Sequence, residues 1–133
     1  MTLSNELYWL TLTLLMTSLF WLPYIINRMA EQGVLSAVWD PYGRTDTGKD
    51  WASRMMQAHQ NSVENLVIFA PLVIMVNSMG LNSEITATAC MVYFLVRMIH
   101  YLAFTFAVPV LRVVTFIIGF GVQSLLAVTL LKG

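Results

Sequence analysis

Three ionisable side chains lie inside long apolar stretches of this chain: Glu64, Arg97 and Arg112. A charge in the middle of a membrane-spanning helix costs roughly 2.5–3.5 kcal/mol on insertion scales, so such a residue normally faces protein or water and has a partner. A carboxylate and two guanidinium groups in this setting are suited either to pairing with one another or to binding a small charged molecule. The neighbours of each residue along the chain indicate which use applies.

The segment around Glu64 carries a stripe of polar side chains. Arg54, Gln57, Asn61 and Glu64 are spaced by three, four and three residues. In a helix this spacing places them on one face, with His59 on the far side. Such a stripe forms either a hydrogen-bonded seam between helices or the wall of a ligand site. The spacing alone leaves both interpretations open.

The apolar stretch 85–106 also has one polar and aromatic helical face. That face holds Tyr93, Arg97, His100, Tyr101 and Phe104. Arg97 and Glu64 are expected to pair across the bundle, because pairing offsets the cost of burying both charges when it is completed by hydrogen bonds. His100 is the only histidine expected to face inward, and one histidine without a matching ligand set does not make a metal site. No metal is therefore expected.

A third polar stripe lies on the stretch 111–131. Its members are Arg112, Phe116, Gly119 and Gln123. Arg112 lies near one end of the stretch, where an arginine either reaches toward the membrane surface or presents its guanidinium to an anion. Taken together, the three stripes indicate a receptor for a small zwitterionic anion. The surrounding Met, Leu, Ile and Phe side chains suit a lipophilic small molecule arriving from the bilayer.

Composition specifies the kind of element that carries these stripes. The 133 residues are 58% hydrophobic and only 11% charged, whereas soluble domains are about 25% charged. We therefore expect an all-α integral membrane protein, a four-helix bundle in one domain over residues 1–133. Its spans are predicted at about 7–26, 62–79, 85–106 and 111–131, each near the ~20 residues that a bilayer requires. Residues 27–57 form the expected polar loop.

Charge and cysteine usage exclude other classes. The formal net charge is +0, so the chain lacks the basic footprint of a nucleic-acid-binding protein. One cysteine, Cys90, cannot build a disulfide framework within the chain. Basic residues are concentrated in the loop 27–57 and on either side of the third connection. The positive-inside rule then predicts that both of these connections are cytoplasmic and that both termini lie on the non-cytoplasmic side.

The stripes also resemble those of a known family. The run R-M-M-Q-A-H-Q-N-S-V-E-N at 54–65 is similar to the second-helix motif R-x-x-R-A-x-x-N-x-x-E of the MAPEG family, the membrane-associated proteins of eicosanoid and glutathione metabolism. The runs R-M-I-H-Y-L-A-F and P-V-L-R-V-V-T-F resemble its third helix and the start of its fourth. The resemblance covers essentially the whole chain. The short third connection is closest to that of the small bacterial members, for which the cell inner membrane would be the location.

The resemblance implies a homotrimer with sites between neighbouring protomers near the cytoplasmic side. It implies glutathione as co-substrate and Arg112 as the catalytic residue that activates the glutathione thiol. The activity would be a transferase or peroxidase reaction, in which the thiolate attacks a lipophilic electrophile or a lipid hydroperoxide. The glutathione-binding residues expected from it are Arg54, Gln57, Asn61, Glu64, Arg97, His100 and Tyr101.

The chain departs from the family pattern at three positions. Gln57 replaces an arginine, Phe104 replaces a tyrosine, and Val113 follows Arg112 where one branch has a serine. A neutral glutamine cannot form the bidentate charged pair that arginine forms with a carboxylate. These departures suit two alternatives. One is a non-enzymatic lipid-binding or scaffold protein, and the other is a small structural subunit of a membrane complex.

Overall fold

The structure, a computed structural model, describes residues 2–43 and 47–133, and across these ranges it has helices and no strand. The all-α prediction is confirmed. The helices are α1 (Asn5–Leu19), α2 (Leu22–Gln32), α3 (Val34–Trp39), α4 (Asp50–Ser78), α5 (Glu84–Thr105) and α6 (Pro109–Lys132). Four stretches in the described residues are long and apolar enough to cross a membrane: Asn5–Gln32, Asp50–Ser78, Glu84–Thr105 and Pro109–Lys132.

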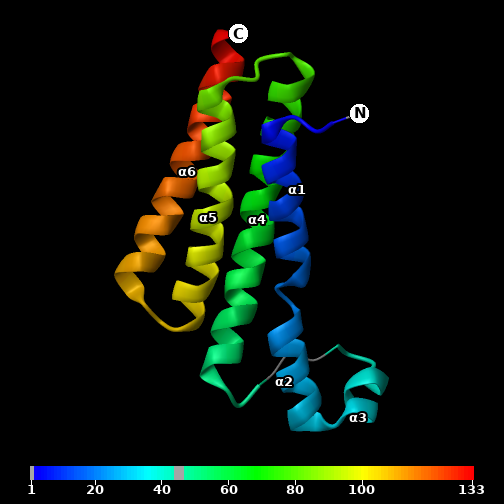
Figure 1. Ribbon diagram of the computed structural model, residues 1–133. Coiled ribbons are helices and arrows are strands. Elements are labelled where there is room, and N and C mark those ends of the chain that lie inside the picture. Colours follow the sequence, from blue (N-terminus) through cyan, green and yellow to red (C-terminus); the bar gives the residue numbers. More distant parts are fainter. Residues whose placement is uncertain (1, 44–46) are drawn as a thin grey trace.

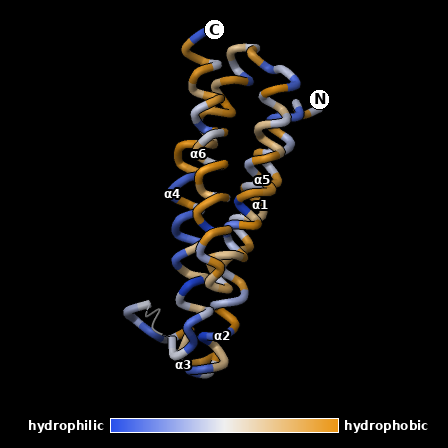
Figure 2. The backbone as a smooth tube through the Cα atoms, turned by 90° about the vertical axis from the view of Figure 1, so that its left-hand side faces the viewer, coloured by the Kyte–Doolittle hydropathy of each residue, from blue (hydrophilic) through white to orange (hydrophobic). Residues whose placement is uncertain are grey.

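The four long stretches pack side by side as an elongated bundle (Figure 1). α5 contacts α6, α4 and α1, and α4 also contacts α1 and α6. In the core, Phe69 stacks on Tyr93 with ring centroids 3.7 Å apart, next to the fully buried Val73 and Leu126. The apolar side chains of the spans extend far beyond this core, and Figure 2 shows hydrophobic residues along most of the bundle. Such an outer surface has to be covered by lipid or by other membrane spans, as expected of a multi-pass integral membrane protein.

The first stretch is broken near its middle, where α1 ends and α2 begins. Pro23 cannot donate an amide hydrogen to the carbonyl of Leu19, so the helical hydrogen-bond ladder is interrupted here. Tyr101 of α5 forms a hydrogen bond at this break, where its hydroxyl donates to the Phe20 carbonyl at 2.8 Å. Its ring stacks on that of Phe20 with centroids 3.7 Å apart. The break therefore has a specific partner on another helix.

We expect Tyr101→Phe to lower the free energy of unfolding by about 1–2 kcal/mol, the usual cost of leaving a buried carbonyl unpaired. The phenyl ring keeps the stacking, so only the hydrogen bond is lost. Thermal unfolding in detergent measures the effect, with Tyr42→Phe as the control because Tyr42 is 75% exposed. Equal midpoints for both variants would show that the hydroxyl does not support the break.

The segment 27–57 is not the single polar loop that hydropathy predicted. α2 continues to Gln32, α3 follows Gly33, and α4 starts at Asp50, so Arg54 and Gln57 lie on a helix. A tertiary contact contributes at the start of α4: Arg54 Nε donates at 2.9 Å to the carbonyl of Thr105 at the C-terminal end of α5, a position where a cation is favourable. Arg44 and Asp46, which belong to the same polar segment, lie outside the described residues.

A buried carboxylate fixes the opposite end of the bundle. Glu6 is 2% exposed and accepts hydrogen bonds from the hydroxyl of Thr86 and the backbone amide of Ser83. Ser83 and Thr86 also form a capping box at the start of α5. Glu6 thus joins the first turn of α1 to the first turn of α5. The spacing of Glu6 along the chain gives no sign of this role, because no other charged residue lies on α1.

Candidate functional site

A cavity of about 220 Å³ lies near the end of the bundle where α5 turns into α6. Three helices contribute to its wall, which consists of Asn61 from α4, His100 and Phe104 from α5, and Arg112, Val113 and Phe116 from α6. Two of the predicted glutathione-binding residues, Asn61 and His100, and the predicted catalytic arginine therefore face one space. The remaining wall is apolar, so the cavity combines a few polar groups with a hydrophobic surface.

Arg112 is in the first turn of α6 and is exposed. Its guanidinium carbon lies 5.0 Å from the centre of the Phe104 ring, a cation–π contact. This contact holds the cation over the cavity wall. The geometry presents a positively charged group at the cavity, with its hydrogen-bond donors available to an anion.

Arg97 lies behind the cavity and is only 2% exposed. One of its terminal nitrogens, Nη2, donates to Asn61 Oδ1 at 2.7 Å and to Ser62 Oγ at 3.1 Å. Because the amide oxygen of Asn61 is engaged by Arg97, its Nδ2 donor is left for the cavity. Arg97 therefore orients a residue of the cavity wall without lining the cavity itself.

The predicted pairing of Arg97 with Glu64 is wrong. In the described residues Arg97 forms no ion pair. Glu64 is exposed and instead accepts a hydrogen bond from Gln60 Nε2 at 3.2 Å. The helical geometry of α4 gives the reason. Arg97 faces the arc between Asn61 and Ser62, whereas Glu64 lies beyond that arc at about 100° per residue.

Two buried nitrogens at the site have no hydrogen-bond partner among the described residues: Arg97 Nε and His100 Nδ1. His100 is 2% exposed, and its ring contacts Phe104 and Phe116 at centroid distances of 5.8 and 6.2 Å. Leaving a buried polar atom unpaired costs about 1–3 kcal/mol. A water molecule or a ligand group reaching these atoms would recover that energy.

The other predicted binding residues lie elsewhere. Gln57 is exposed on α4, Arg54 binds the end of α5, and Tyr101 contacts the break between α1 and α2. The structure thus gathers Asn61, Arg97, His100 and Arg112 but not Gln57, Glu64, Arg54 or Tyr101.

The stripe predicted on α6 also forms contacts inside the bundle. The Nε2 of Gln123 donates to the Asn65 carbonyl at 3.2 Å, and Gly119 is buried against Tyr93 and Arg97. Sequence reasoning missed Ser62 as a partner of Arg97. The position of Ser62 next to Asn61, on the side of the helix away from Glu64, is the feature that could have indicated this contact.

The fold and the cavity define the class: a multi-pass α-helical membrane protein with an arginine-containing cavity between three of its spans. Within that class, the model of the MAPEG family matches residues 7–132. The chain belongs to the MAPEG family. Neither the curated proteins nor the solved structures contain a match to the chain.

Proposed function

We propose that this protein is a membrane-embedded transferase or peroxidase that binds glutathione and activates its thiol. One observation carries the proposal: the Arg112 guanidinium, Asn61 and the buried His100 face a single cavity whose other walls are apolar. The polar groups suit the charged peptide, and the apolar walls suit a lipophilic electrophile or lipid hydroperoxide. MAPEG membership supports this reading, since the family acts in glutathione and eicosanoid metabolism.

In this proposal Arg112 stabilises the thiolate of glutathione. A free thiol has a pKa of about 8.5, and the thiolate is the nucleophile. Lowering that pKa by about two units requires about 2.7 kcal/mol of preferential stabilisation of the thiolate. A guanidinium in a partly dry cavity can supply this amount, because the low local dielectric strengthens its interaction with the anion. Asn61 and His100 would then hold the peptide next to Arg112.

The polar residues outside the cavity support contact with a second protomer, and we propose the homotrimer that the family resemblance implies. Gln57 and Glu64 are exposed on α4, inside or next to a membrane span where lipid is a poor neighbour for polar groups. A second protomer packed against this face would cover them and add them to the site. We further propose that α2, α3 and the start of α4 are on the cytoplasmic side, in accordance with the basic residues near that end.

Ultraviolet difference absorbance of the purified protein during a glutathione titration at neutral pH tests the proposal. We expect a saturable thiolate band. Absence of the band at millimolar glutathione would overturn thiol activation. S-methylglutathione serves as the matched control because it has the same charged groups but no thiol.

A non-enzymatic lipid-binding or scaffold protein is the second candidate, and Phe104 and Val113 favour it. Both line the cavity and are apolar where hydroxyl-bearing residues occur in other family members. In that case mass spectrometry of the purified protein would find stoichiometric lipid, and glutathione would not displace it. A small structural subunit of a membrane complex would instead purify with a stoichiometric protein partner.

Restoring an arginine at position 57 is expected to strengthen glutathione binding. In Gln57→Arg the side chain regains the bidentate pairing with a carboxylate, so the dissociation constant should fall about three- to tenfold, as charge-assisted hydrogen bonds are about twice as strong as neutral ones. Gln57→Lys is the control, because lysine adds the same charge without the planar fork. Isothermal titration of both variants measures the difference. No gain for Gln57→Arg would place residue 57 outside the site.

A further inference from the structure

The short helix α3 exposes a hydrophobic surface at one end of the molecule. At about 100° per residue, its four large apolar side chains occupy one arc of about 140°. These side chains are Val34, Leu35, Val38 and Trp39, with exposed fractions of 58, 76, 68 and 79%. Ser36 lies outside this arc, and Ala37 lines a small pocket with Ile25 of α2, to which Val38 at the middle of the arc also contributes. We call the four residues the α3 arc.

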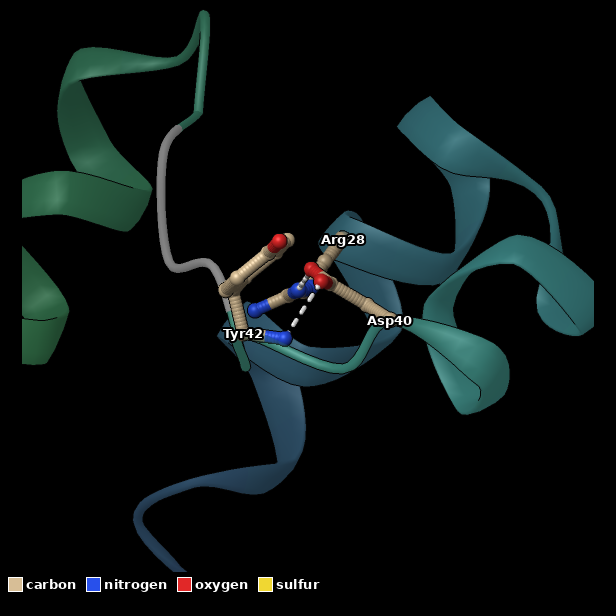
Figure 3. A network of polar contacts seen from close by, with 3 residues as sticks. All are labelled: Arg28, Asp40 and Tyr42. Carbon is tan, nitrogen blue, oxygen red and sulfur yellow. Dashed lines mark hydrogen bonds and ion pairs between the residues drawn. The ribbon is translucent and has the colours of Figure 1, made fainter.

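Polar contacts fix how α3 is held. Arg28 of α2 and Asp40, which directly follows α3, form an ion pair at 2.6 Å, with both side chains about 10% exposed. The other carboxylate oxygen of Asp40 accepts from the backbone amide of Tyr42 at 2.9 Å (Figure 3). The chain therefore anchors α3 to α2 at its C-terminal end, and the α3 arc is exposed in a set orientation.

Helix lengths give the level of α3 relative to a bilayer. α5 has 22 residues, about 33 Å at 1.5 Å per residue, close to the ~30 Å hydrocarbon core. The stretch Asn5–Gln32 has 28 residues, at most about 42 Å because it is broken between α1 and α2, so it reaches past the core into the headgroup layer. Figure 1 shows α3 at the end of the bundle, beyond the turn from α5 to α6. α3 thus lies at the level of the headgroups.

We propose that α3 is an interfacial membrane anchor, with the α3 arc inserted into the headgroup and acyl boundary of the surrounding bilayer. Tryptophan and tyrosine are enriched at this depth, where an apolar ring and a polar atom are both satisfied, and Trp39 and Tyr42 are the aromatic residues at this end of α3. Hydrophobic side chains buried there hold a helix in the plane of the interface. In this arrangement α3 extends the lipid-facing surface of the protein to a segment that does not span the membrane.

Two spin labels, one inside the α3 arc and one just outside it, test the proposal. Leu35→Cys and Ser36→Cys, each in a Cys90→Ala background, are labelled with a nitroxide and placed in lipid nanodiscs. Electron paramagnetic resonance then compares collisions with oxygen, which concentrates in lipid, and with a water-soluble nickel chelate. We expect the ratio of oxygen to nickel collisions to be several-fold higher at position 35 than at position 36. Glutathione is absent, so the outcome does not depend on the proposed activity.

Two results would overturn the anchor. Equal and high nickel access at both positions would show that the α3 arc faces water. Low access of both reagents at position 35 would show that protein, such as a second copy of this chain, covers the arc. Quenching of Trp39 by lipids brominated near the headgroup provides an independent reading: wild type should lose more fluorescence than Trp39→Phe. Both positions are exposed, so the labels leave the bundle core unchanged; size-exclusion profiles verify this.

Discussion

Arg112→Ala is expected to abolish the thiolate band that glutathione forms in the wild-type protein. At pH 7 a thiol with a pKa of about 8.5 is about 3% ionised, and one with a pKa of about 6.5 is about 75% ionised. Loss of the guanidinium therefore removes most of the thiolate. The second-order rate of attack on an electrophile such as a chlorinated dinitrobenzene should fall about tenfold to 100-fold.

Two further variants separate this effect from misfolding. Lys132→Ala removes a cation from the other end of α6, far from the cavity, and should leave the band unchanged. Arg112→Lys retains the charge but loses the planar donors, so it should recover only part of the band. A wild-type band in Arg112→Ala, with an unchanged size-exclusion profile, would remove Arg112 from the mechanism.

Arg97→Met is expected to weaken glutathione binding about tenfold or more while leaving thermal stability nearly unchanged. Arg97 holds Asn61 through a charged hydrogen bond of 2.7 Å, and such bonds contribute about 1.5–3 kcal/mol. Without it the amide of Asn61 keeps only the longer hydrogen bond from Asn65 Nδ2, at 3.3 Å, and its orientation toward the cavity is less well fixed. The loss of stability should stay small, because removing a buried guanidinium that has no ion-pair partner also removes its desolvation penalty, which offsets the lost hydrogen bonds.

Calorimetric titration and thermal unfolding of the same samples measure both effects. Asn61→Ala is the matched variant, since it removes the residue that Arg97 positions. If Arg97 acts through Asn61, the double variant should bind no more weakly than either single variant, because the two changes remove the same interaction. Additive losses would mean that Arg97 contacts the ligand directly. A large fall in unfolding temperature would assign Arg97 a structural role.

Periodicity located most of the residues that meet in the cavity. The stripe Arg112, Phe116, Gly119 and Gln123 does face the bundle interior or the cavity. The buried positions of Arg97 and His100 were also predicted, because a charge or imidazole in a span normally faces protein. The runs at 54–65 and 97–104 also indicated that the chain belongs to the MAPEG family, and the family model confirms this.

Periodicity failed where the choice of partner depends on how helices are rotated against one another. Glu64 and Asn61 share one stripe, yet only Asn61 meets Arg97. Tyr101 shares a stripe with His100, yet it contacts the break between α1 and α2. A stripe on a helix is about 100° or more wide, so its two edges reach different neighbours. The packing of core side chains between helices sets how each helix is rotated about its axis. The spacing of residues along one helix carries no information about that rotation.

The amino-acid sequence by itself determined that the chain is a membrane protein, that it is all-helical, and that its polar residues form stripes along single helices. These properties follow from composition and from spacing along single helices, which are local quantities. Tertiary structure alone decided that Asn61 rather than Glu64 meets Arg97, that Tyr101 supports a helix break, and that Glu6 joins α1 to α5. Each of these contacts links residues more than 30 positions apart. Such pairs depend on the rotation and offset of whole helices, which only the packed bundle fixes.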